Sequence, residues 1–168
     1  YDEEYLAMAL ESYFGLWAHD PEGEHWAGGH EYRYINRQEM MVGDPQGFNL
    51  IKEFFGENWR YTAELPPEFD GVFSLGYVPG LAYTNRSQYL KNVVITGDNN
   101  IGIVGNSFDN DVWGNQASNS FVGGGSNDYF HGGGGIDRAV FSGAYEEYAI
   151  LVGAEWNDYI MSVVDFYT

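Results

Sequence analysis

The sequence predicts a mixed α+β fold, in which a helical N-terminal segment is followed by a short parallel coil of β-strands and a β cap. Four consecutive nine-residue blocks occupy residues 105–140 and indicate the coil. Apolar residues recur at helical spacing over residues 2–17, and two alternating segments follow the blocks. We therefore expect four segments in chain order: a helical lobe at 1–62, a connector at 63–91, the coil at 92–143 and the cap at 144–168.

Two helices are expected in the first third of the chain. The segment at 2–17, DEEYLAMALESYFGLW, places its apolar residues on one helical face, and its acidic start suits the positive end of the helix dipole. A second helix is expected at 45–55, because proline favours the first turn and Gly56 favours a stop. Strands are expected from Asn92 onward, where short β-branched runs begin.

The nine-residue blocks read GNSFDNDVW, GNQASNSFV, GGGSNDYFH and GGGGIDRAV. Each block begins with glycine, which allows a turn with positive φ. The eighth residue is large and apolar in three blocks: Val112, Phe121 and Phe130. A three-residue strand cannot bury this side chain alone, so successive blocks must stack to form a continuous apolar column. The period therefore predicts a coil rather than a flexible glycine-rich linker.

The sixth residue of each block is an acid or an amide: Asn110, Asn119, Asp128 and Asp137. Stacked turns bring these side chains together, where neighbouring carboxylates repel one another. Calcium removes such repulsion, because it accepts six to eight oxygen ligands in irregular geometry, backbone carbonyls included. A coil closed by asparagine ladders, with no ion, is the alternative interpretation.

These blocks resemble the RTX (hemolysin-type) calcium-binding family, whose repeats form a parallel β-roll. The resemblance covers about residues 90–150, and a degenerate block at Thr96–Val104 keeps its register. It implies that the four sixth residues bind calcium together with backbone carbonyls of the turns. It also implies two blocks per coil, so that Asn110 stacks on Asp128 and Asn119 on Asp137. One carboxylate per pair departs from the family pattern, and Asp109 and Asp111 are candidate additional calcium ligands.

The segment after the blocks, AVFSGAYEEYAILVGAEWNDYIMSVVD, resembles the cap of RTX rolls. Such a cap covers the apolar column and the strand edge that the last coil leaves open. We expect its strands at 149–152 and 159–164. The resemblance further implies export by the type I secretion machinery through an uncleaved C-terminal signal. The predicted location is therefore extracellular.

The composition narrows the classes of partner. The formal net charge is −18, from 25 acidic against 7 basic side chains. This charge excludes a basic footprint for nucleic acid and disfavours an anionic membrane surface. No stretch approaches the apolar length of a membrane span. The chain contains no cysteine, so a secreted fold needs a stabilising link other than a disulfide, and bound metal is one.

The first third also resembles the C-terminal part of secreted gluzincin zinc metallopeptidases, the class that includes the catalytic domain of anthrax lethal factor. The matching segments are EEYLAMALESYF, YRYINRQEMM and DPQGFNLIKEFFGENWRY, within residues 2–62. The resemblance implies that Glu4 is the third zinc ligand, although Met8 departs from the family pattern. The alternative is that Glu4 only complements the helix dipole.

The chain contains no HExxH motif, and the nearest sequence, at 30–34, has tyrosine where the second histidine should stand. The rest of a zinc site would therefore lie upstream of Tyr1, and this chain alone is expected to be catalytically silent. His19, His25 and His30 match no standard zinc spacing and are expected in an ordinary acidic loop.

We expect this chain to be the C-terminal part of a secreted RTX protein that binds calcium in the roll. The parent protein is expected to contain a zinc peptidase that acts on peptides. The alternative is a non-catalytic extracellular module with a structural or adhesive role, whose exposed aromatic residues could bind a surface glycan.

Overall fold

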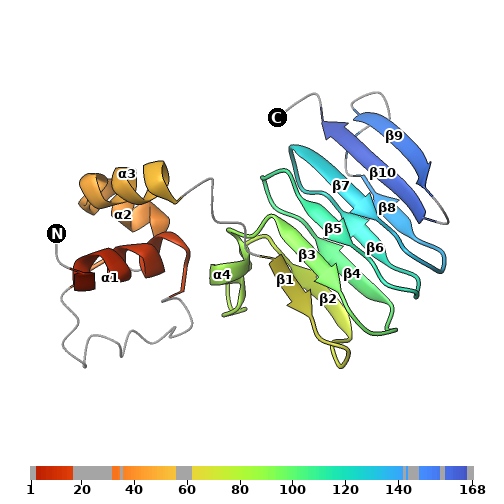
Figure 1. The fold of residues 1–168 in the computed structure, drawn as a ribbon, viewed down its shortest axis with the longest axis horizontal. Helices are drawn as coiled ribbons and strands as arrows, with labels where there is room; N and C mark the ends of the chain where they lie inside the picture. Colours follow the sequence, from red (N-terminus) through yellow and green to blue (C-terminus); the bar gives the residue numbers. More distant parts are fainter. Residues whose placement is uncertain are drawn as a thin grey trace. The chain divides into compact units, whose positions relative to one another are not determined.

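The computed structural model describes residues 3–16, 32–34, 36–55, 62–141, 143, 148–155 and 158–165, the last two ranges as main chain only. Figure 1 shows its helices and strands. The chain divides into two compact units. The helical unit comprises residues 1–60 and 78–89, and the coil unit comprises residues 61–77 and 90–168.

Three helices of the helical unit pack around one small apolar core: α1 (Glu3–Tyr13), α2 (Arg37–Gly43) and α3 (Pro45–Phe54). The short α4 (Thr84–Ser87) also belongs to this unit. The buried apolar residues of the core are Ala9, Tyr13, Phe14, Met40 and Ile51. α3 lies where the sequence predicted it, whereas α1 ends before Gly15, which has a positive φ of 67°.

α2 was not predicted from the sequence. Asn36 is its N-cap: its side-chain oxygen accepts a hydrogen bond from the Glu39 N–H at 2.9 Å, and its amide donates to the Glu39 carboxylate at 2.9 Å. The first bond satisfies one of the backbone donors that a helix start otherwise leaves free, and the second fixes the Asn36 side chain in the capping position. The helix has only seven residues and buries only Met40 among them, which explains why apolar periodicity did not reveal it.

Asp44 joins three elements of the helical unit. Its Oδ1 caps α3 by accepting the Gly47 N–H at 3.0 Å. Its Oδ2 accepts the hydroxyls of Tyr32, at 2.8 Å, and of Tyr5 on α1. Burial raises the pKa of Asp44, but these hydrogen bonds outweigh burial and leave the pKa below its usual value. The ionised carboxylate is therefore the form that holds α1 against the start of α3.

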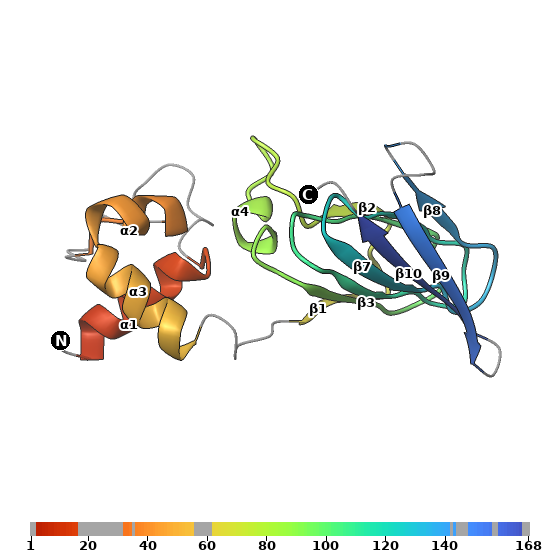
Figure 2. The same cartoon turned by 90° about the horizontal axis from the view of Figure 1, so that it is seen from above.

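The coil unit consists of two sheets (Figure 2). From β1 to β8, successive strands of the chain enter the two sheets in turn. The six-stranded sheet has the order β1-β3-β5-β7-β10-β9, and the four-stranded sheet has the order β2-β4-β6-β8. All pairs among β1 to β8 are parallel. The strands are β1 (Thr62–Leu65), β2 (Gly71–Ser74), β3 (Asn92–Ile95), β4 (Ile101–Val104), β5 (Asp111–Trp113), β6 (Ser120–Val122), β7 (Asn127–His131) and β8 (Arg138–Val140).

The eighth residues of the blocks form the apolar interior of this coil. Val112 is in register with Phe130 in one sheet, and Ile103 is in register with Phe121 in the other. Phe121 and Phe130 stack at a centroid distance of 5.0 Å. All four side chains are buried. The register advances by 18 residues per coil here, which is two blocks, as the resemblance to RTX repeats implied.

The coil begins earlier than expected. β1 and β2 lie within 63–91, the segment predicted to be a connector, and pair in parallel with β3 and β4. The first register step is 30 residues, from Leu65 to Ile95, because the chain leaves the coil at 75–91 before β3. This excursion hides the period, so a search for nine-residue spacing cannot detect the first coil.

The expected pair of cap strands is present as β9 (Tyr148–Glu155) and β10 (Asp158–Asp165). They form an antiparallel hairpin, and β10 pairs antiparallel with β7. The predicted mixed α+β class is thus confirmed. Within the described part of the chain, no helix has the length and apolar character needed to cross a membrane.

Truncation of Phe121 tests whether the apolar column stabilises the coil. Phe121→Ala removes a buried ring from between Ile103 and Ala139, its register neighbours, and should lower the free energy of unfolding by about 3–5 kcal/mol. Ile136→Ala is the control, because Ile136 is 84% exposed and should change stability little. Urea unfolding monitored by circular dichroism measures both; equal effects would contradict this packing.

Candidate cation-binding turns

Four turns connect the strands that carry the nine-residue blocks. We call residues 105–110 and 114–119 the asparagine turns, and residues 123–128 and 132–137 the glycine turns. Each glycine turn stacks on the asparagine turn 18 residues before it. The Asn110 N–H donates to Asp128 Oδ1 at 3.0 Å, and the Asn119 N–H donates to Asp137 Oδ1 at 2.8 Å. The predicted pairing of sixth residues across stacked turns is therefore present.

The first asparagine turn closes itself through two asparagines. The Asn110 oxygen accepts the Asn106 N–H at 3.0 Å, while the Asn110 amide nitrogen donates to the Asn106 side-chain oxygen at 3.0 Å. The Asn106 oxygen also accepts the Phe108 N–H at 3.0 Å. The Asn106 amide nitrogen donates to the Leu90 carbonyl at 2.8 Å. Both side chains are buried, and their hydrogen-bonding capacity is largely used inside the coil.

The second asparagine turn repeats most of this arrangement. The Asn119 oxygen accepts the Asn115 N–H at 3.0 Å, and the Asn115 oxygen accepts the Ala117 N–H at 2.9 Å. The Asn115 amide nitrogen donates to the Asn99 carbonyl at 3.0 Å. The buried amide nitrogen of Asn119 has no hydrogen-bond acceptor among the described residues. This turn therefore leaves one donor unsatisfied, which costs stability.

The glycine turns have a different backbone. Gly124 and Ser126 in one, and Gly133 and Gly135 in the other, have positive φ values of 103°, 65°, 84° and 83°. No residue of the two asparagine turns has a positive φ. A Cβ atom on Gly133 would overlap the Asn115 carbonyl oxygen of the turn beneath. Glycine is therefore required both for the local conformation and for the close approach of the stacked turns.

The remaining predicted ligands lie in separate places. Asp109 faces the next turn of its stack, where its Oδ1 accepts the Asn127 N–H at 3.0 Å. Asp111 is the first residue of β5 and lies beside Tyr129 in the register of the six-stranded sheet, away from the turns. Its Oδ1 is buried and has no hydrogen-bond partner among the described residues.

Glu4 lies in the first turn of α1, and its side chain is outside the described part, as are His19, His25 and His30.

The two glycine turns each place one carboxylate against backbone. Asp128 is 3% exposed. Burial raises the pKa of Asp137, and the hydrogen bond from the Asn119 N–H only partly opposes this shift. No basic side chain contributes to this shift. Among the described residues, the backbone N–H of Asn119 is the group that offsets the cost of burying the Asp137 carboxylate. An ionised Asp137 is thus destabilising unless a cation approaches it.

The chemistry of these turns fits a hard cation better than a transition metal. In the described ranges, no three His, Asp or Glu side chains gather closely enough to hold a metal by themselves. Each stack instead offers one aspartate and the carbonyl oxygens of glycine-rich backbone, such as those of Gly123 and Gly132. Oxygen-only donor sets suit calcium, and the low number of carboxylates favours weak binding. The residues that would hold calcium are Asp128 and Asp137, with turn carbonyls.

Sequence reasoning missed the role of Asn106 and Asn115. Both are the second residue of their block, where the last two blocks have glycine. The recurrence of asparagine at the second and sixth positions of the same two blocks was the available signal. It indicates that both side chains accept hydrogen bonds from backbone N–H groups of their own turn, a common local role of asparagine in turns.

Comparison with known proteins adds no relative: no family model, curated protein or solved structure matches this chain.

Substitution of Gly133 tests the close approach of the turns. Gly133→Ala should destabilise the coil more than Gly71→Ala, although both positions have positive φ and pay strain of about 1–2 kcal/mol. A methyl group on Gly133 must also displace the Asn115 carbonyl, whereas a methyl group on Gly71 meets open space. Chemical denaturation of both variants measures the difference, and equal losses would show that the stacked turns are farther apart than described.

The raised pKa of Asp137 predicts a pH dependence in metal-free buffer. The penalty for ionisation is absent below the unfolded-state pKa of about 4 and grows as the pH rises through the folded-state value. Asp137→Asn keeps an oxygen for the Asn119 N–H and removes the charge. The variant should therefore lose part of the decline in stability between pH 4 and 7. Urea unfolding with chelator at several pH values measures this effect; a variant less stable than the parent chain at pH 7 would contradict the assignment.

Proposed function

We propose that the coil unit is a calcium-stabilised β-roll of the RTX type and that it serves as a non-catalytic module of an extracellular protein. One observation carries this proposal: each glycine turn holds a single aspartate, Asp128 or Asp137, whose Oδ1 accepts a backbone N–H of the stacked turn, and burial raises the pKa of Asp137. Such a carboxylate gains stability from an oxygen-coordinated cation.

The charge and composition of the chain support the same function. A net charge of −18 on 168 residues opposes compaction until cations screen it or bind. The sequence has no cysteine with which to form disulfides. Extracellular calcium is abundant enough to occupy even weak sites, since extracellular modules have dissociation constants of about 10⁻⁴–10⁻³ M. Weak sites with one carboxylate each are therefore sufficient for a module that folds outside the cell.

Calcium binding is tested by thermal unfolding of the full chain with calcium and with chelator. At calcium concentrations about 100-fold above the dissociation constant, the coil unit should gain about 2.7 kcal/mol for each occupied site. Magnesium should give a smaller gain, because it requires regular octahedral geometry. The Asp128→Asn/Asp137→Asn double variant is the matched control and should lose the calcium response. An unfolding curve that is the same with calcium and with chelator would refute the proposal.

The expectation of zinc at Glu4 stays a prediction that rests on the resemblance of residues 2–62 to peptidases. The described contacts of the helical unit are structural: Asp44 caps α3, and the guanidinium of Arg37 lies 3.9 Å from the Tyr13 ring and 4.1 Å from the Tyr89 ring. Burial lowers the pKa of Arg37, although the neighbouring tyrosines partly oppose this effect. Stacking on two aromatic rings compensates for removing this cation from water.

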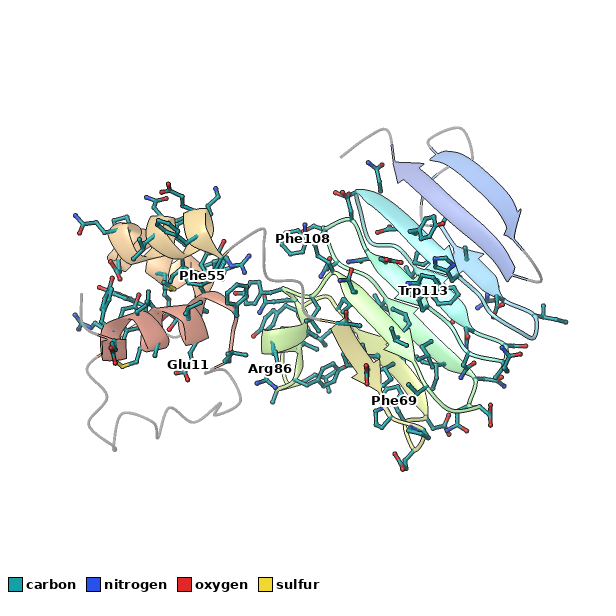
Figure 3. All side chains as sticks on the ribbon, viewed as in Figure 1. Glu11, Phe55, Phe69, Arg86, Phe108 and Trp113 are labelled. Atoms are coloured by element: carbon teal, nitrogen blue, oxygen red, sulfur yellow. The ribbon has the colours of Figure 1, made fainter. Side chains whose placement is uncertain are left out.

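A second candidate function is adhesion through the outer face of the six-stranded sheet. Trp113 is 44% exposed and lies over this sheet (Figure 3). Its ring stacks on the ring of His131 at 3.4 Å, and the edge of Tyr129 meets His131 at 4.6 Å. The indole is thus held in a fixed orientation with much of its surface in solvent. A rigid, exposed aromatic face is suited to stacking against the apolar face of a sugar.

If the coil unit binds glycans, the fluorescence of Trp113 should change when a sugar stacks on its ring. Titration with neutral oligosaccharides, such as chito- and cello-oligomers, should alter tryptophan fluorescence, and Trp113→Ala should abolish the change without unfolding the coil. Phe69→Ala controls for loss of an aromatic residue elsewhere in the coil unit. Unchanged fluorescence with every oligosaccharide at millimolar concentration would exclude this second function.

A further inference from the structure

We propose that the coil contains two kinds of turn with different needs: the asparagine turns close without a cation, and calcium acts only on the last coil, residues 123–140. The inference rests on the proposed calcium-binding function and narrows it. It removes Asn110 and Asn119 from the set of calcium ligands and assigns them instead to a cation-independent part of the fold. Calcium then governs the C-terminal end of the coil and the strand that docks there.

The first line of support is the use of the asparagine oxygens. The oxygen of Asn110 accepts the N–H of Asn106, and the oxygen of Asn119 accepts the N–H of Asn115, both at 3.0 Å. Asn110 and Asn119 are each 2% exposed. A calcium ion would compete with this buried backbone donor for the amide oxygen, and loss of the hydrogen bond costs about 1–3 kcal/mol. A neutral amide offers the cation too little in return, compared with a carboxylate.

The second line of support is that the asparagine turns connect to the coils before them without carboxylates. The Asn106 amide donates to the Leu90 carbonyl at 2.8 Å, and the Asn115 amide donates to the Asn99 carbonyl at 3.0 Å. The Ser118 N–H donates to the Asn100 oxygen at 3.0 Å. These bonds between neutral groups continue the stack from β3 onward, and neither Asp109 nor Asp111 takes part in them. The closure of the asparagine turns therefore needs no cation.

The third line of support is the conformational cost of the glycine turns. Residues 123–125 and 132–135 are all glycine, and glycine loses more backbone freedom on folding than any other residue. The second position, where the asparagine turns have Asn106 and Asn115, has no side chain in these turns and so cannot form the same local bonds. Their sixth residues are the ionisable Asp128 and Asp137. The last coil thus combines the largest entropy loss with buried charge, and a bound cation offsets both.

The strand register connects this last coil to the cap. Asp128 lies in β7, where its backbone is in register with Val163 of β10, and Phe130 is in register with Met161. β10 joins the six-stranded sheet through β7. Ordering of the 123–128 turn by calcium therefore also orders the strand on which β10 docks. Calcium should complete the fold at its C-terminal end, after the asparagine turns have formed.

Hydrogen–deuterium exchange of the full 168-residue chain, read by mass spectrometry, tests this division. In chelator, peptides covering 92–122 should exchange about 100-fold more slowly than the unfolded chain, whereas peptides covering 123–140 and 158–165 should stay within about tenfold of it. Calcium should slow exchange in the latter peptides by about 100-fold and leave the former little changed. Calcium-dependent protection across both regions would overturn the inference while leaving the proposed calcium binding intact. Protection of both regions in chelator, with no effect of calcium, would overturn the inference and the proposed function together.

A charge introduced into an asparagine turn provides the reverse test. Asn110→Asp replaces the amide donor to Asn106 with a second oxygen and should make protection of residues 105–113 calcium-dependent. Asn100→Asp is the matched control: Asn100 is exposed, and an aspartate there keeps the oxygen that accepts the Ser118 N–H while adding the same charge. This control should leave 105–113 protected in chelator. If Asn110→Asp also stays protected without calcium, the cation-free closure of the turn does not depend on the asparagine pair, and the inference fails.

Discussion

The architecture of the coil depends on one repeated hydrogen bond, in which the side chain of the sixth residue of a turn accepts the backbone N–H of the sixth residue in the turn 18 residues before it. This bond occurs between Asn110 and Asp128 and between Asn119 and Asp137, at 3.0 and 2.8 Å. It fixes the 18-residue register and thereby superimposes the eighth residues of successive blocks. Slippage by one residue would turn the interior phenylalanines outward, so the turns and the apolar column specify the same register.

The parts of the fold that could be predicted are those in which one period governs a long stretch. The spacing of Val112, Phe121 and Phe130 predicted the interior column, and the resemblance to RTX repeats implied the stacked pairs of sixth residues; both are present. The helix at Pro45 and the hairpin of the cap also lie where local pattern placed them.

The parts that escaped prediction depend on geometry that a period does not record. The first coil is separated from the next by the excursion at 75–91, so Leu65 and Ile95 are neighbours at a spacing of 30 residues. α2 depends on the capping exchange between Asn36 and Glu39 rather than on an apolar stripe. The resemblance to calcium-binding repeats treated all four sixth residues alike. Only the contacts of Asn106 and Asn115 distinguish a turn that bonds to itself from a turn that carries a buried charge.

The antiparallel hairpin formed by β9 and β10 has a consequence for the size of the assembly. A parallel coil has no intrinsic length, because its last strand presents the same template to any strand that follows, from this molecule or from another. β10 runs against β7, and β9 occupies the end of the six-stranded sheet. A reversed strand cannot template another parallel turn in register, so the hairpin ends the parallel growth of this sheet.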